Sequence, residues 1–149
     1  LLFFNFPKPF IFIGDGGAYF LGFLLSTILI YFSEENILSP FFCLSVVFYP
    51  IYETFRSFFR RLFTANSSFM KPDRLHLHSL IYRKISLKSN FKNNWIGNSL
   101  ASILTLIFPS LLCIWACINF DKRNFLIFGI ILFLFIYESL IYYLKKNEF

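Results

Sequence analysis

The chain has 149 residues, of which 57% are hydrophobic, 23% aromatic and 15% charged, whereas an average soluble domain is about 45–50% apolar and about 25% charged. This composition is typical of a membrane protein, and it excludes a disordered region and a soluble all-α or α/β enzyme. The net charge is +6, yet the basic residues gather in one loop beside apolar segments, so we expect no nucleic acid among the partners.

The first residues form an apolar stretch that begins with Leu1 and lacks the basic start and the cleavage site of a signal peptide. We therefore expect residues 1–149 to be the C-terminal portion of one integral-membrane domain. Three closely spaced glycines follow, Gly14, Gly16 and Gly17. They predict a tight backbone turn before the first long apolar run.

Four apolar runs are long enough, as helices, to cross a bilayer core that is about 30 Å thick. They lie at about residues 17–33, 37–54, 96–118 and 125–144. The predicted fold class is therefore all-α, a polytopic membrane helix bundle with about four transmembrane helices. A hydrophilic loop at about residues 55–95 joins the second span to the third.

The basic residues give the bundle an orientation. Nine of the 14 Lys and Arg lie between residues 54 and 92. By the positive-inside rule, that loop and both chain ends are predicted to be cytoplasmic. The acidic turn at residues 34–36 and the turn at residues 121–124 then face outward.

Two further helical segments are predicted beside and within the loop. Pro50 should kink the second span, and residues 55–63 should form an amphipathic interfacial helix whose arginines lie on the face away from its Phe and Leu residues. Apolar periodicity predicts a short helix at about residues 74–86, with Asp73 as its N-cap.

Asp15 stands among the glycines where the first span begins. Backbone N–H groups and the positive end of a helix at such a place suit a phosphate together with a divalent cation. A role as the capping residue of the helix is an alternative that the residues leave open.

Two carboxylates lie inside or beside the spans. Glu138 falls within the last apolar run, where a carboxylate is a functional candidate. Because no second intramembrane charge accompanies it, we expect a structural ion pair or hydrogen bond with another span. Glu53 is expected near the membrane interface, where a charge costs less.

The two histidines of the chain, His76 and His78, lie in the basic loop close to Arg74. On a helix, residues i and i+2 do not share a face, and further ligands for zinc are not evident nearby. The group is typical of a receptor for an anionic, phosphorylated ligand. The alternative is a solvated loop that faces anionic lipid headgroups.

Two stretches of the sequence indicate a protein family more specifically together than either does alone. In residues 5–17, Asn-Phe-Pro precedes Gly-Asp-Gly-Gly, and in residues 50–78, Pro-Ile-Tyr-Glu-Thr precedes a pair of arginines and His-Leu-His. Over roughly residues 5 to 85 this pattern resembles the polyprenyl-phosphate N-acetylhexosamine-1-phosphate transferases, which are related to muramoyl-pentapeptide phosphotransferase. The family's His-x-His-His ends in Ser79 here, and its Asp-Asp pair on an earlier loop has no counterpart in residues 1–149.

The resemblance implies an enzyme that transfers N-acetylhexosamine-1-phosphate from a UDP-sugar to polyprenyl (undecaprenyl) phosphate, releases UMP and so initiates a cell-envelope polysaccharide. It implies a Mg²⁺ cofactor, with Mn²⁺ as a substitute, and Asp15 as the catalytic metal ligand. Asn5 would orient the same loop for substrate binding, and Arg74, His76 and His78 would contact the UDP-sugar.

The resemblance also implies a multi-pass protein of the bacterial inner membrane, with a cytoplasmic active site and the polyprenyl tail in grooves between the spans. A homodimer is compatible with this organisation. We expect the isolated chain to be inactive, because the family's Asp-Asp pair is not part of it. The competing hypothesis is a non-catalytic membrane remnant or scaffold whose basic loop binds anionic lipid.

Overall fold

The computed structural model describes residues 5–8, 10–11, 13–63, 75–88 and 94–146 of the chain. Its helices are α2 (Gly14–Glu34), α3 (Pro40–Phe63), α4 (Leu77–Lys88), α5 (Asn94–Ile118) and α6 (Arg123–Lys146). This described part contains no strand, which confirms the all-α prediction.

Three helices of the described part are long and apolar enough to cross a membrane, namely Gly14–Glu34, Trp95–Ile118 and Arg123–Lys146. They match the expected first, third and fourth spans. The expected second span falls in the first part of α3. That helix is more polar as a whole, because it continues into a segment that carries a glutamate and several arginines.

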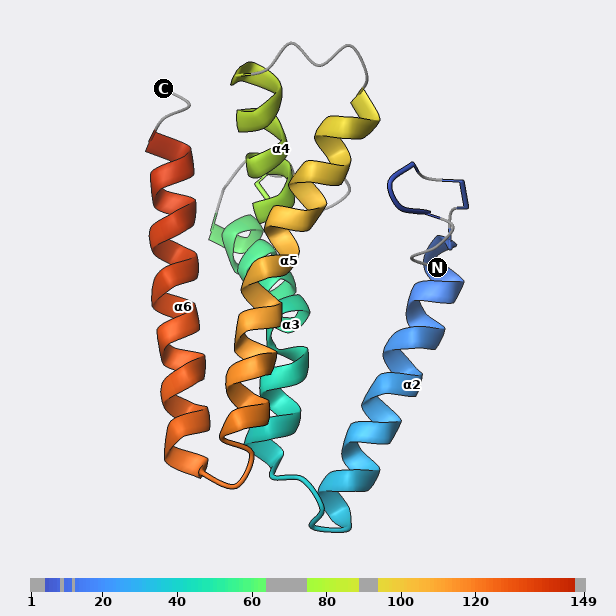
Figure 1. The fold of residues 1–149 in the computed structure, drawn as a ribbon, viewed down its shortest axis with the longest axis vertical. Helices are drawn as coiled ribbons and strands as arrows, with labels where there is room; N and C mark the ends of the chain where they lie inside the picture. Colours follow the sequence, from blue (N-terminus) through green and yellow to red (C-terminus); the bar gives the residue numbers. More distant parts are fainter. Residues whose placement is uncertain (1–4, 9, 12, 64–74, 89–93, 147–149) are drawn as a thin grey trace.

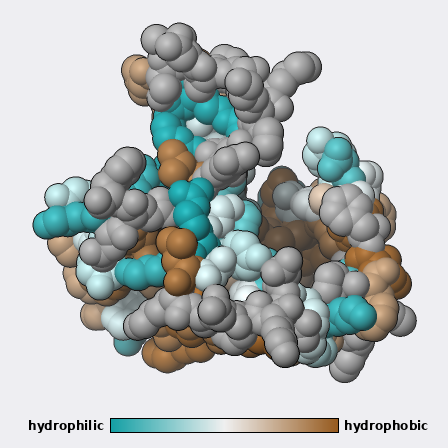
Figure 2. All heavy atoms as spheres, turned by 90° about the horizontal axis from the view of Figure 1, so that it is seen from above, coloured by the Kyte–Doolittle hydropathy of each residue, from teal (hydrophilic) through white to brown (hydrophobic). Residues whose placement is uncertain are grey.

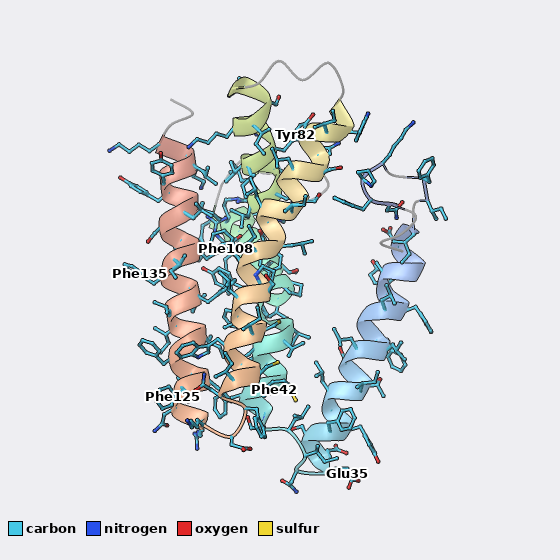
Figure 3. All side chains as sticks on the ribbon, in the orientation of Figure 1. Glu35, Phe42, Tyr82, Phe108, Phe125 and Phe135 are labelled. Carbon is cyan, nitrogen blue, oxygen red and sulfur yellow. The ribbon has the colours of Figure 1, made fainter. Side chains whose placement is uncertain are left out.

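The helices α3, α5 and α6 lie side by side along the long axis, and α4 packs against one end of this group (Figure 1). Among the described helices, α2 contacts α3 alone, and it diverges from the others toward its first turn. None of its residues is buried. Its side chains project into open space along its length (Figure 3).

The helix ends lie at two opposite ends of the molecule, in the arrangement that the distribution of basic residues predicts. Both short turns lie at one end of the molecule, which Glu35 and Phe125 mark in Figure 3. The start of α2, the end of α3, the start of α5 and the end of α6 lie toward the other end (Figure 1). Seen from above, hydrophilic residues gather over this second end (Figure 2). That it faces the cytoplasm remains a prediction.

The helix α3 continues without interruption through Pro50, so the expected interfacial helix is the last part of a longer one. Its two faces are as predicted, but the environment of each differs from the expectation. Phe55 and Phe59 are 56% and 50% exposed, while Arg56 and Arg60 are partly buried. In a bilayer the outer face of a bundle is apolar, and charged side chains find partners inside it.

The helix α4 is part of the core. Leu77, Leu80 and Ile81 are buried and form one cluster with residues of α5 and α6, among them the fully buried Tyr137. Burial of each leucine contributes about 1.5–3 kcal/mol. The helix predicted at about residues 74–86 is thus confirmed, with its first residue at Leu77 and its last at Lys88. The expected N-cap, Asp73, lies outside the described residues.

Trp115 joins α5 to α6 near their connecting turn. Its indole Nε1 donates a hydrogen bond to the backbone oxygen of Phe125 at 2.9 Å. The ring lies against Gly129, where an added Cβ would collide with the indole. The two helices approach closely here because position 129 has no side chain.

Candidate functional site

The segment before α2 is held by Asn5. Its Oδ1 accepts hydrogen bonds from the backbone N–H groups of Phe10 and Ile11, at 3.2 and 2.9 Å. The same segment is attached to α5, because the hydroxyl of Ser99 donates to the backbone oxygen of Pro7. The side chain of Asn5 thus orients the loop that leads to Asp15, while contact with a substrate stays a prediction.

The glycines after this loop form the expected tight turn into α2. Gly14 has a φ of +66°, a conformation that costs little without a side chain. Gly17 lies so close to Ile13 that an added Cβ would collide with the isoleucine side chain. The turn therefore allows α2 to begin directly after a bend in the chain.

Asp15 is exposed and lies in the first turn of α2. The N-cap position belongs to Ile13, which makes no side-chain cap hydrogen bond. The alternative that Asp15 is the capping residue is therefore wrong. Its carboxylate lies where the helix dipole favours a negative charge.

The Mg²⁺ site predicted from the sequence would have one ligand among the described residues, Asp15. No group of three or more His, Cys, Asp or Glu side chains in these ranges could hold a metal ion. Mg²⁺ commonly uses one or two carboxylates and completes its shell with water and substrate phosphates. The single exposed carboxylate of Asp15 fits this partial ligand set.

A buried carboxylate joins α3 to the start of α4. Glu53 is 8% exposed, and its Oε2 lies 2.8 Å from His76 Nδ1. Its Oε1 accepts hydrogen bonds from the Leu77 N–H at 3.1 Å and from the Tyr49 hydroxyl at 3.4 Å. That Glu53 lies near the membrane interface stays a prediction, and the structure adds that the residue is buried in the helix bundle as a bridge between two elements.

The two histidines lie together, contrary to the expectation from helical spacing. Their rings are stacked, with centroids 5.8 Å apart and an angle of 13° between the planes. This is possible because His76 precedes α4 whereas His78 lies in its first turn. Partial burial, and to a lesser extent the neighbouring imidazole of His76, lower the pKa of His78. Arg74, the third expected member of the group, lies outside the described residues.

A second polar contact lies between α3 and α6. Glu138 Oε1 accepts hydrogen bonds from the Tyr52 hydroxyl and from Arg56 Nε, both at 2.7 Å. The Arg56 guanidinium also lies over the Tyr137 ring, 5.9 Å from its centroid. The expected ion pair between Glu138 and another span is thus present, and it fixes α3 against α6.

The site therefore has two parts. Asn5 and Asp15 belong to the start of α2, while Glu53, His76 and His78 belong to the junction of α3 and α4. The described helices α2 and α4 make no contact with each other, so within the described residues the two parts of the site stay separate. Both parts lie toward the same end of the helices (Figure 1).

Glu53 is the site residue that sequence reasoning did not single out. A carboxylate within an apolar helix needs a partner, since burial of an unpaired charge is costly. The arginines that follow in the sequence and the two histidines are groups that could supply one. The sequence predicts a partner for Glu138 but not for Glu53, because Glu53 lies at the edge of its apolar run.

Comparison with known proteins points to one class of enzyme. The chain is 36% identical over 81 residues to the undecaprenyl-phosphate alpha-N-acetylglucosaminyl 1-phosphate transferase of Thermotoga maritima. The match covers 54% of this chain and 26% of that protein, so the chain spans about a quarter of the length of its relative. No family model and no solved structure matches. The similarity supports a relationship to the polyprenyl-phosphate sugar-phosphate transferases, which are membrane enzymes that use a lipid substrate.

Proposed function

We propose that this chain is part of an enzyme that transfers N-acetylhexosamine-1-phosphate from a UDP-sugar to polyprenyl phosphate and releases UMP. The observation that carries the proposal is the similarity to a transferase that acts on undecaprenyl phosphate. The arrangement of the helices supports it, since the first turn of α2 and the junction of α3 with α4 lie toward one end of a bundle of apolar helices (Figure 1).

The reaction requires alignment and neutralisation of charge. An oxygen of the polyprenyl phosphate attacks the sugar-side phosphorus, a new P–O bond forms, and the bond to the UMP oxygen breaks. Side chains that hold charged oxygens in line lower the barrier to such a transfer. In this proposal His76, His78 and Arg74 bind the pyrophosphate of the donor.

Mg²⁺, or Mn²⁺ in its place, supplies positive charge to the phosphates when it is bound. Asp15 holds the metal ion through its exposed carboxylate. Asn5 contributes indirectly, because it fixes the backbone of the loop that leads to Asp15. The two parts of the site would act together only when the donor and the metal ion lie between them.

The acceptor lipid would lie against the apolar sides of the spans, with its phosphate at their polar end. Large exposed hydrophobic residues cover α2, α5 and α6, and such surfaces favour contact with hydrocarbon. We place the protein in the bacterial inner membrane with the basic loop on the cytoplasmic side. There the product would initiate a cell-envelope polysaccharide.

The test is an assay of UMP release by the complete protein, with UDP-N-acetylglucosamine and undecaprenyl phosphate as substrates. Asp15→Asn should abolish Mg²⁺-dependent release, because the amide is a poor ligand for a hard cation. Glu34→Gln is the matched control, since it removes a carboxylate from the opposite end of the same helix. Near-normal turnover of the Asp15→Asn protein would remove this residue from the site.

A non-catalytic role is the second candidate, favoured by the basic residues at the polar end of α4 and α6. Lys84 Nζ lies 4.2 Å from the centre of the Tyr143 ring, and Lys145 and Lys146 occupy the last turn of α6. Such residues attract anionic headgroups. This candidate predicts lipid binding that weakens with salt and has no dependence on nucleotide, and saturable binding of UDP-sugar would contradict it.

A further inference from the structure

Glu53 uses both of its carboxylate oxygens on the segment that carries the histidines. One oxygen faces His76 Nδ1 at 2.8 Å, and the other accepts the backbone N–H of Leu77 at 3.1 Å. The two bonds fix adjacent residues, one through its ring and one through its backbone. The direction of the His76 ring is therefore set from α3 by Glu53, together with its stacking on His78 in the first turn of α4.

We propose that Glu53 is a positioning residue for His76, one that keeps the proton on Nδ1 and directs Nε2 toward a phosphate of the donor. The inference rests on the proposed function, which it deepens. A carboxylate bonded to Nδ1 fixes the tautomer and the orientation of an imidazole. Because Nδ1 is engaged by Glu53, any hydrogen bond from the ring to a phosphate has to come from Nε2.

Charge explains why a carboxylate suits this position better than an amide. A ring that faces Glu53 with Nδ1–H and also donates to a phosphate through Nε2 requires a proton on each nitrogen. The Glu53 carboxylate accepts the hydrogen bond that Nδ1–H donates, and its negative charge compensates the positive charge of that form. A glutamine could cap Leu77 with its carbonyl oxygen, but its NH₂ group would face Nδ1 and would favour a ring protonated only at Nε2.

Glu138 provides a matched comparison. It is also a glutamate that pairs between helices, but it binds Tyr52 and Arg56 and no histidine among the described contacts. A change from carboxylate to carboxamide there removes an interhelical charge and leaves the bonds to His76 in place. The pair Glu53→Gln and Glu138→Gln therefore separates positioning of His76 from general stability.

The first measurement is ¹⁵N NMR of the histidine-labelled complete protein in lipid nanodiscs, under alkaline conditions where the rings are neutral. His76 should show a proton on Nδ1 in the wild type and in Glu138→Gln, and a proton on Nε2 in Glu53→Gln. In a separate sample near neutral pH, UMP added to the wild type should shift the Nε2 signal of His76 in a saturable way. This titration needs no variant, so it decides the contact even if Glu53→Gln fails to fold.

The second measurement is the kinetics of UMP release. Glu53→Gln should raise the KM for UDP-N-acetylglucosamine about tenfold with a smaller change in kcat, because a phosphate contact present in both ground and transition states is weakened. Glu138→Gln should leave the KM for the donor unchanged. A structural role alone would lower the yield or the stability of both variants without a selective effect on KM.

The outcomes separate the inference from the proposed function. A protein that turns over, but whose His76 tautomer and donor KM do not depend on Glu53, would overturn the positioning role and leave the function intact. A protein whose His76 carries its proton on Nδ1, but which neither releases UMP nor responds to UMP, would overturn the proposed function and with it the phosphate contact. The predicted tautomers together with the selective rise in the KM for the donor would support both the positioning role of Glu53 and the proposed function.

Discussion

Acidic residues differ in burial and in hydrogen-bond partners between the helix α2 and the group of helices α3 to α6. In the group, Glu53 is buried and has hydrogen-bond partners on α4, and Glu138 pairs with α3. On α2, Asp15 is exposed and no residue is buried. The comparison teaches that the histidine part of the site is preorganised by this chain, whereas the Asp15 part presents its carboxylate on a helix that has few neighbours.

The largest expected effect comes from removal of the buried carboxylate. Glu53→Leu should lower the free energy of unfolding by about 3 kcal/mol, because it leaves His76 and the Leu77 N–H without their acceptor in a buried place. Asp15→Leu should change it by less than about 0.5 kcal/mol, as is usual for an exposed position. Unfolding of both variants in detergent measures the difference in free energy of unfolding. Equal stabilities would contradict the contrast between the two regions.

Close packing gives the next largest effect. Gly129→Ala should destabilise the protein by about 1–3 kcal/mol, because the new Cβ collides with the Trp115 indole and forces the helices apart. Gly22→Ala on α2 has nothing within 4 Å of the new Cβ. It should be neutral or stabilising, since alanine is preferred to glycine inside a helix by about 0.5–1 kcal/mol. Thermal unfolding of the two proteins checks the pair, and a neutral Gly129→Ala would contradict the packing.

The ion pair between α3 and α6 should contribute less. A double-mutant cycle with Arg56→Met and Glu138→Gln should give a coupling free energy of about 1 kcal/mol, because the Glu138 side chain is 48% exposed while that of Arg56 is 15% exposed. The cycle is measured by unfolding in detergent. A coupling of zero would mean that the contact does not hold the two helices together.

The smallest expected effect is a dependence on pH through His78. The protein lowers the pKa of His78 below its ordinary value of 6.5, so the unfolded chain takes up this proton at a higher pH than the folded protein. Stability should therefore fall as pH decreases below 6.5 until the folded form is protonated as well. His78→Gln should flatten this part of the profile. An identical slope in both proteins would show that His78 titrates normally when folded.

Much of the fold follows from the sequence because the membrane imposes simple rules. Apolar runs of about 20 residues predict helices, and α2, α5 and α6 lie within a few residues of the expected bounds. The pairing of Glu138 could be predicted for the same reason, since a carboxylate in an apolar run requires a partner. The tight turn at Gly14 follows from the residue type alone.

The rest depended on tertiary contacts that local patterns do not contain. The helix α3 is continuous through Pro50, and it packs against α5 and α6. Its arginines point into the bundle because the outside is apolar. The stacking of His76 on His78 required the start of α4 at Leu77, and that start is itself stabilised by Glu53, a residue 24 positions earlier.

The most direct test of the central claim, that the junction of α3 and α4 binds a nucleotide donor, is equilibrium binding of UMP to the complete protein in nanodiscs. The wild type should bind saturably, His76→Ala should bind about tenfold more weakly because a charge-assisted hydrogen bond is lost, and Lys122→Ala at the opposite end should bind like the wild type. The same affinity in His76→Ala as in the wild type, or no saturable binding in any of the three, would contradict the claim.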